Sequence, residues 1–237
     1  MEIYVYILFY FISAALFIAL KTSLRPNLEN FLKRKGYVSY NNILTLTKAI
    51  PLIIAIVFSY YLRSKRSDVF LGIFLALIFC LLGDYFIDRS LIQGMLLFAI
   101  AHIFFIFSFL YATTIHLINF SATDFIVLSI ITSLIILYDY TFLRYMNILH
   151  IPQKYILPVT LYTILLSFMF ASSVWLTYLL TIGEVIILPL GTLLFVVSDS
   201  MIAMREFSGR EIKNSSLYIM GTYYSAIFLI SLTVMYI

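Results

Sequence analysis

Residues 68–87 read DVFLGIFLALIFCLLGDYFI, and this stretch decides the fold class. No residue from Val69 to Gly83 carries a charge, so the charged side chains stand at or near the two ends. A helix of this length spans about 30 Å, which is the thickness of the hydrocarbon core of a bilayer. The stretch therefore predicts a transmembrane helix that places Asp84 at bilayer depth.

The composition extends this prediction to the whole chain. Of 237 residues, 63% are hydrophobic and 11% are charged, and the mean hydropathy is +1.06. A soluble domain has about 45–50% apolar and about 25% charged residues. The chain has too little polar surface for a soluble globule. We therefore expect residues 1–237 to form a single integral membrane domain.

The apolar runs predict an all-α, polytopic bundle of about eight transmembrane helices. They cover residues 3–20, 42–62, 68–87, 91–112, 122–141, 154–179, 183–204 and 216–236. Seven or nine helices are the alternatives, because Pro158, Gly183 and Pro189 interrupt the pattern between 154 and 204. The runs are continuous rather than alternating, which argues against a β-barrel. The first run lacks a basic segment before it, so we interpret it as a retained helix rather than a signal peptide.

Basic residues in the connections predict the orientation. The loops after the first, third, fifth and seventh helices, here called the odd loops, hold eleven: Lys21, Arg25, Lys33, Arg34, Lys35, Arg89, Arg144, Lys154, Arg205, Arg210 and Lys213. The opposite face has three, namely Arg63, Lys65 and Arg66. This asymmetry favours odd loops in the cytoplasm and both termini outside. In a bacterium, the membrane would be the inner one.

Four ionisable residues lie inside the predicted helices: Lys48, Asp84, His102 and Asp199. Each costs roughly 2.5–3.5 kcal/mol to insert at bilayer depth, so each needs a reason. At about 1.5 Å per residue, they lie roughly 5–16 Å below the odd-loop face. Four hydroxyl residues fall in the same layer: Tyr162, Thr222, Tyr223 and Tyr224. We therefore expect one polar cavity in this half of the bundle.

Purely structural roles are the alternatives for several of these residues. Lys48 would either snorkel to the interface, pair with a carboxylate or bind a substrate headgroup. His102 would be a hydrogen-bonded core residue or a member of the site. Asp88 and Arg89 are interpreted as interfacial residues at the helix end.

Two short motifs raise the possibility of an internal duplication. Gly83-Asp84 and Ser198-Asp199 each stand near the end of a helix, and each is followed by a basic loop and a helix that opens near a glycine, Gly94 or Gly221. A four-plus-four repeat would place the two aspartates at equal depth.

Other classes of function find little support in the residues. The net charge of +4 comes from loop residues that suit membrane orientation, so we expect no nucleic-acid partner. Cys80 is the single cysteine, and no Cys/His spacing typical of a metal site occurs. The oligomeric state has no signal in the sequence.

The polar motifs resemble a known membrane family, the YhhN or lysoplasmalogenase family. The resemblance rests on Gly83-Asp84, on residues 94–102 (GMLLFAIAH), on residues 191–203 (GTLLFVVSDSMIA) and on residues 220–226 (MGTYYSA). Residues 47–51 (TKAIP) and 158–162 (PVTLY) also fit the pattern of the family. The resemblance covers about residues 45–235.

This resemblance implies an eight-helix enzyme, without a cofactor, that hydrolyses the vinyl-ether bond of lysoplasmalogens. Its lipid substrate would yield a fatty aldehyde and glycerophosphocholine or glycerophosphoethanolamine. Vinyl ethers are cleaved by acid, and two carboxylates in unequal surroundings suit such chemistry. Asp84 and Asp199 would be the catalytic pair, with the order of roles open. Lys48, His102, Tyr162, Ser198, Thr222, Tyr223 and Tyr224 would bind substrate or support the pair.

Two other classes stay open from the residues alone. Intramembrane Asp, Lys and His also serve proton-coupled transporters, which need polar groups across the whole bilayer. A lipid-binding membrane protein without catalysis would tolerate replacement of both aspartates. A metal-dependent hydrolase has a thin ligand set in one interior His and two Asp.

Overall fold

The computed structural model describes residues 2–24, 29, 40–62, 67–116, 120–149, 151–180, 186–207 and 214–236. Several residues used for the prediction of orientation and spans lie outside this part of the chain: Arg25, Lys33, Arg34, Lys35, Arg63, Lys65, Arg66, Gly183, Arg210 and Lys213.

The described residues form eight helices, each long and apolar enough to cross a membrane. They are α1 (Glu2–Lys21), α3 (Tyr40–Tyr61), α4 (Ser67–Ile87), α5 (Leu91–His116), α6 (Ala122–Ile148), α7 (Gln153–Leu180), α8 (Ile187–Phe207) and α9 (Ser215–Thr233). The all-α prediction of eight spans is confirmed, and the chain is an integral multi-pass membrane protein.

Some helix ends differ from the predicted ones. The helix α5 continues to His116 rather than 112, and α6 continues to Ile148 rather than 141. Threonine hydroxyls inside these helices donate to carbonyls one turn back, as Thr113 does to Leu110 and Thr141 does to Leu137. Polar residues are thereby accommodated within the helix, so hydropathy alone underestimates its length. Conversely, α9 ends at Thr233 rather than 236.

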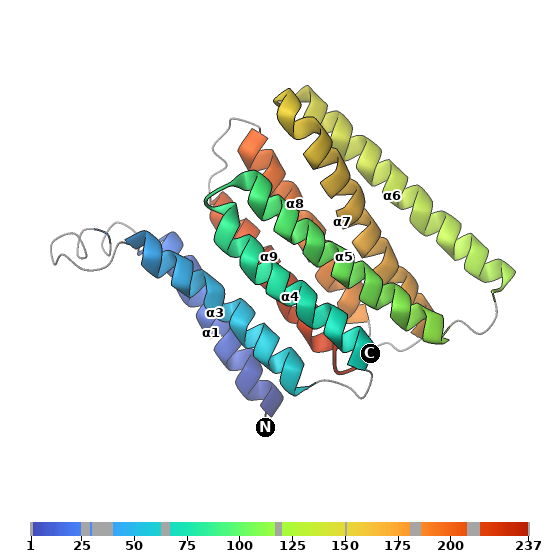
Figure 1. Cartoon of the computed structure of the whole chain (residues 1–237), viewed down its shortest axis with the longest axis horizontal. Coiled ribbons are helices and arrows are strands. Elements are labelled where there is room, and N and C mark those ends of the chain that lie inside the picture. The colour runs from blue at the N-terminus through green and yellow to red at the C-terminus, as the bar shows by residue number, and fades with distance from the viewer. Residues whose placement is uncertain are drawn as a thin grey trace.

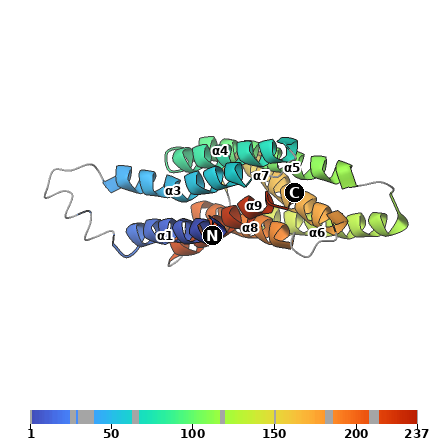
Figure 2. The ribbon, with the colours of Figure 1, turned by 90° about the horizontal axis from the view of Figure 1, so that it is seen from below.

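The helices lie in two layers (Figures 1 and 2). One layer contains α3, α4 and α5, and the other contains α1, α9 and α8, while α7 packs against both α5 and α8. The helix α6 lies at the edge and packs mainly on α7. Its other face carries exposed large apolar residues such as Ile130 and Leu134, as expected for a surface in contact with lipid.

The first helix is tied to the last by buried hydroxyl groups. The Tyr10 hydroxyl donates to the Tyr224 carbonyl at 2.7 Å, and the Tyr6 and Ser231 hydroxyls are 2.6 Å apart. The Tyr224 hydroxyl donates in turn to the Lys48 carbonyl of α3 at 3.2 Å. Interhelical hydrogen bonds of this kind hold transmembrane helices together where the hydrophobic effect between helices is absent. They hold α1 and α3 against α9.

The predicted four-plus-four duplication stays a prediction, and the contacts between helices agree with it only in part, because α1 contacts α9 without a comparable contact between α6 and α5 in the described part of the chain. The pairs α1·α3, α3·α4 and α4·α5 of the first four helices have counterparts in α6·α7, α7·α8 and α8·α9. Across the two halves, α3 contacts α9 just as α7 contacts α5. A repeat with four helices per half keeps both halves in the same orientation in the membrane.

The orientation is tested by labelling engineered cysteines from outside intact cells. Cysteine at Lys154, beside the start of α7, is expected to resist a membrane-impermeant maleimide, because the odd loops are predicted to face the cytoplasm. Cysteine at Phe120, which is exposed before α6 at the opposite face, is expected to react. The native Cys80 is fully buried and gives a low background. The reverse pattern of labelling contradicts the orientation.

Candidate active site

The predicted site residues come together at the odd-loop end of the bundle, the upper left end in Figure 1. Asp84 and Asp199 lie towards the carboxyl ends of α4 and α8, whereas Lys48, Tyr162 and Tyr223 lie towards the amino ends of α3, α7 and α9. Antiparallel neighbours bring these opposite helix ends to one level. The polar layer expected from the sequence is therefore built by helices from both halves of the chain.

Lys48 is the centre of the first cluster. Its ammonium lies 3.4 Å from Asp84 Oδ1 and 3.0 Å from Asp88 Oδ2, and it donates to the Asp84 carbonyl at 2.9 Å. The side chains of Lys48 and Asp84 are nearly fully buried, whereas that of Asp88 is 59% exposed. The sequence left three roles open for Lys48: snorkelling to the interface, pairing with a carboxylate and binding a substrate headgroup. In the structure Lys48 pairs with carboxylates.

Asp199 belongs to a second cluster that has no lysine. The Tyr162 hydroxyl donates a short hydrogen bond to Asp199 Oδ2 and lies 3.0 Å from Nε2 of His102. His102 Nε2 itself is 3.7 Å from Asp199 Oδ2. Because the single Tyr162 proton points to Asp199, His102 is assigned as the donor to the Tyr162 oxygen. The result is a hydrogen-bonded chain from His102 through Tyr162 to Asp199.

Both aspartates line one polar cavity of about 310 Å³. Its wall also includes Lys21, Lys48, Asp88, Arg89, Ser90, Phe98, Arg205, Glu206 and Tyr223. Asp84 Oδ2 and the Tyr223 hydroxyl oxygen are buried in this wall and interact with each other, but neither makes a hydrogen bond of regular geometry. Buried polar atoms without such hydrogen bonds are costly, so these two are suited to hold a water or a polar group of a ligand.

An apolar slot of about 40 Å³ adjoins the polar cavity. The two share Ile87, Leu91, Phe98, Asp199 and Ile202 as wall residues. The slot continues between α5, α6, α7 and α8, where its wall includes Met95, Tyr138, Phe142, Val159 and Leu166. Asp199 thus stands at the boundary between a polar and an apolar compartment.

A match to a protein-family model extends over residues 43–234, from the start of α3 to the end of α9. This range contains both carboxylates, Lys48 and the whole His102–Tyr162–Asp199 chain. The chain belongs to the YhhN family. The YhhN family includes lysoplasmalogenases, so the resemblance stated from the motifs is confirmed at the level of the family. No curated protein sequence and no solved structure was found to match the chain.

Five residues expected in the site lie outside the wall of the polar cavity: His102, Tyr162, Ser198, Thr222 and Tyr224. Tyr162 and His102 are connected to the cavity through Asp199. The Thr222 hydroxyl donates to the carbonyls of Tyr218 and Ile219 within α9. Ser198 is fully buried and donates to Ile219, joining α8 to α9. Tyr224 bonds to the Lys48 carbonyl, as described above. These contacts hold together the helices around the site. Thr222 and Tyr224 do not line the cavity as Tyr223 does, because neighbouring positions on a helix point in different directions.

Asp88 and Lys21 are cavity residues that sequence reasoning did not assign to the site. Asp88 was interpreted as an interfacial residue beside Arg89; its side chain is 59% exposed, and it also accepts a hydrogen bond from Lys48. Asp88 follows directly after Ile87, the last residue of α4, and its spacing of four residues from Asp84 was a signal available in the sequence. Among the described residues, no group of three or more His, Cys, Asp or Glu could hold a metal ion.

Proposed function

We propose that the protein hydrolyses the vinyl-ether bond of a lysoplasmalogen, releasing a fatty aldehyde and glycerophosphocholine or glycerophosphoethanolamine. The observation that carries the proposal is the position of the two carboxylates. Asp84 and Asp199 line one polar cavity, and Asp199 also faces the apolar slot. A lysoplasmalogen has the same division, because its vinyl ether joins a polar glycerophosphate to a hydrocarbon chain.

The chemistry requires a proton donor, a carboxylate and a water. A proton adds to the β-carbon of the vinyl ether and gives an oxocarbenium ion. Water then adds to the cationic carbon, and the resulting hemiacetal separates into aldehyde and alcohol. Two carboxyl groups in different surroundings perform comparable acid and base steps in glycoside hydrolysis.

Asp84 suits the role of stabiliser and base. Burial of Asp84 disfavours its carboxylate form, and the Lys48 ammonium at 3.4 Å offsets part of that cost by direct Coulomb attraction. Its Oδ2, which has the Tyr223 hydroxyl as a neighbour and makes no hydrogen bond of regular geometry, would hold the attacking water and accept its proton. In the last step, the same proton would pass from Asp84 to the glycerol oxygen that leaves.

Asp199 suits the role of acid. Tyr162 donates a hydrogen bond to it, and His102 Nε2 lies 3.7 Å away. Among the described residues, no lysine lies within an ion-pair distance of Asp199. Because Tyr162 occupies Oδ2, the acidic proton would lie on Oδ1 and would be given to the β-carbon. The Tyr162 hydroxyl would then stabilise the carboxylate that forms, and the hemiacetal hydroxyl proton would return to it. The two aspartates thus end the cycle in their starting states.

The transporter alternative is less well supported. A permeation path needs polar groups along the whole membrane normal. Within the described chain, the buried ionisable residues Lys48, Asp84, His102 and Asp199 gather at the odd-loop end. Asp124, at the other end, is occupied in capping α6 with Ser121 and in accepting from Tyr178.

Release of a fatty aldehyde by the purified protein tests the proposed function. The protein is expected to produce aldehyde from a lysoplasmalogen and none from the analogue with a saturated ether, because only the vinyl ether can accept a proton on carbon. Asp68→Asn is a matched control on the opposite end of α4, where Asp68 is exposed. It is expected to keep full activity. Absence of aldehyde with a protein that still binds the saturated analogue would refute hydrolysis.

A further inference from the structure

Four cationic side chains line the polar cavity: Lys21, Lys48, Arg89 and Arg205. Two of them are neutralised by carboxylates. Lys48 is paired with Asp84 and Asp88, and Arg205 donates to Glu206 at 2.8 Å. Within the described part of the chain, Lys21 and Arg89 have no carboxylate in salt-bridge distance. The cavity therefore has two cations whose charge is available to a ligand.

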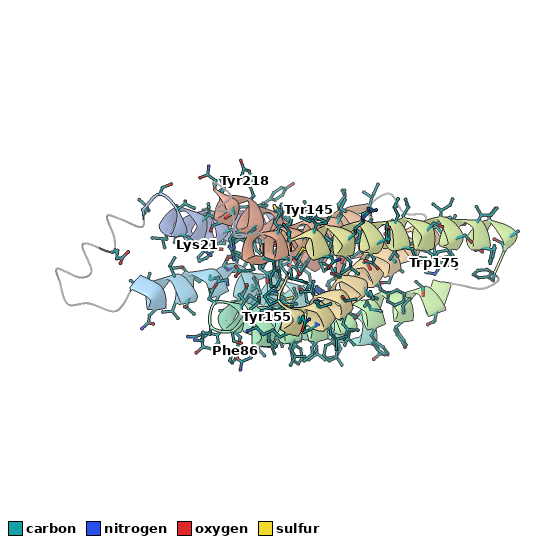
Figure 3. All side chains as sticks on the ribbon, turned by 90° about the horizontal axis from the view of Figure 1, so that it is seen from above. Lys21, Phe86, Tyr145, Tyr155, Trp175 and Tyr218 are labelled. Atoms are coloured by element: carbon teal, nitrogen blue, oxygen red, sulfur yellow. The ribbon has the colours of Figure 1, made fainter. Side chains whose placement is uncertain are left out.

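Both cations are held in place by aromatic rings. The Lys21 ammonium lies 5.7 Å from the centre of the Phe17 ring, at the end of α1. The Arg89 guanidinium lies 3.6 Å from the centre of the Tyr85 ring, and one of its amino groups donates to the Tyr85 carbonyl at 2.8 Å. Guanidinium has five N–H donors, so donors remain for an anion. Figure 3 shows Lys21 at the end of α1, distant from Trp175 along the bundle.

The amino terminus of α5 opens into the same cavity. Ser90 and Leu91 belong to the cavity wall, and the first helical hydrogen bond of α5 runs from the Gly94 nitrogen to the Ser90 carbonyl. The N–H groups before Gly94 have no carbonyl within the helix to bind. Such groups and the positive end of a helix of 26 residues favour an anion. This feature is independent of the two cations and favours the same ligand charge.

These groups lie closer to the membrane surface than the catalytic candidates. Lys21 is the last residue of α1, and Arg89 stands in the turn between α4 and α5. Asp199 lies eight residues before Phe207, the last residue of α8, which is about 12 Å along the helix. In a lysolipid, the phosphate and the vinyl ether are attached to opposite ends of the glycerol. A lysolipid whose phosphate lies near Lys21 and Arg89 would therefore have its vinyl ether deeper in the membrane, near Asp199.

We infer that Lys21, Arg89 and the amino terminus of α5 form a binding subsite for the phosphate group of a lysophospholipid. This inference rests on the proposed function and assigns the headgroup end of the same site. The sequence alone left open a headgroup role for Lys48. Because its charge is compensated by Asp84 and Asp88, we do not assign it as a ligand of the phosphate. Asp88 and Glu206 also line the cavity, but Asp88 shares the Lys48 ammonium with Asp84, and Glu206 is bound to Arg205.

Binding of two uncleavable lipids tests the subsite without any need for catalysis. The probes are radiolabelled 1-alkyl-glycero-3-phosphocholine and 1-alkylglycerol, which has the same chain but no phosphate. Binding is measured with purified protein in nanodiscs, for the wild type and for Lys21→Gln, Arg89→Gln and the double variant. Lys154→Gln is the matched control, because Lys154 stands at the same membrane face but outside the cavity wall.

Each single variant is expected to weaken binding of the phosphocholine probe by about tenfold, the loss expected for one charge-assisted hydrogen bond. Binding of 1-alkylglycerol is expected to stay unchanged, which also shows that the variants are folded. Equal binding of the phosphocholine probe by the double variant and the wild type would overturn the inference. So would competition by glycerophosphocholine as strong as that by the lysolipid, since the subsite would then take a free phosphate ester. Phosphate-dependent binding without release of aldehyde would support the subsite and refute the proposed hydrolysis.

Discussion

Asp199→Asn is expected to lower vinyl-ether hydrolysis by about 10²–10⁴-fold, the usual contribution of a general acid. Asparagine keeps the volume of the side chain and an oxygen that accepts from Tyr162, but it cannot give a proton to carbon. The loss should fall on turnover rather than on lipid binding, because the proton moves only in the transition state. The measurement is the rate of aldehyde release at saturating lysoplasmalogen, with binding of the saturated ether analogue measured in parallel.

The control for Asp199→Asn is Asp68→Asn, which changes an exposed carboxylate at the opposite face. Asp88→Asn is unsuitable as a control because Asp88 is bound to Lys48. We expect Asp199→Asn to keep its thermal midpoint in detergent, since the hydrogen bond from Tyr162 is retained. Turnover close to that of the wild type would exclude Asp199 as the acid.

Asp84→Asn is expected to lower turnover by about 10²–10³-fold, as does the removal of one preorganised electrostatic group in other hydrolases. The amide cannot stabilise the oxocarbenium ion by charge or take a proton from water. This variant also removes one of the two carboxylates around the buried Lys48 ammonium. Loss of a partner leaves a buried charge less well compensated, so a lower thermal midpoint than that of Asp199→Asn is expected.

The double variant Asp84→Asn/Asp199→Asn tests whether the two aspartates act in one shared site or independently. Both carboxylates act in one sequence of proton transfers, so the double variant should be about as slow as the slower single variant. Losses that multiply would show that the two residues act independently. A drop in stability without a drop in turnover for Asp84→Asn would leave Asp84 with a structural role only.

The all-α fold and the eight transmembrane helices could be predicted from the sequence, because a bilayer requires long apolar helices. The position of Lys48, Asp84 and Asp199 near the odd-loop ends of their helices was readable from the sequence, and the three residues line one cavity. The partners of these residues were not predictable. Whether Lys48 pairs with Asp84 or Asp199 depends on how α3 packs on α4, and hydropathy contains no information on helix neighbours.

Asp139 illustrates the same limit for a residue that the sequence did not single out. The helix α6 was expected to end at 141, which placed Asp139 at the membrane surface. Because α6 continues to Ile148, Asp139 lies nine residues before its end, with Ser167 donating to it from α7 at 3.1 Å. The Tyr162–Asp199 hydrogen bond was also not predictable from the sequence, because it joins side chains of two helices and depends on how each helix is rotated about its axis.

Hydrolysis in D₂O tests the central claim most directly. The purified protein is given lysoplasmalogen in D₂O, and the aldehyde is reduced to the alcohol as it forms, so that later exchange is prevented. Acid cleavage through the β-carbon predicts one deuterium on carbon 2 of the released chain, as read by mass spectrometry. Aldehyde without deuterium on carbon 2 would contradict proton transfer to carbon and, with it, the roles proposed for Asp199 and Asp84.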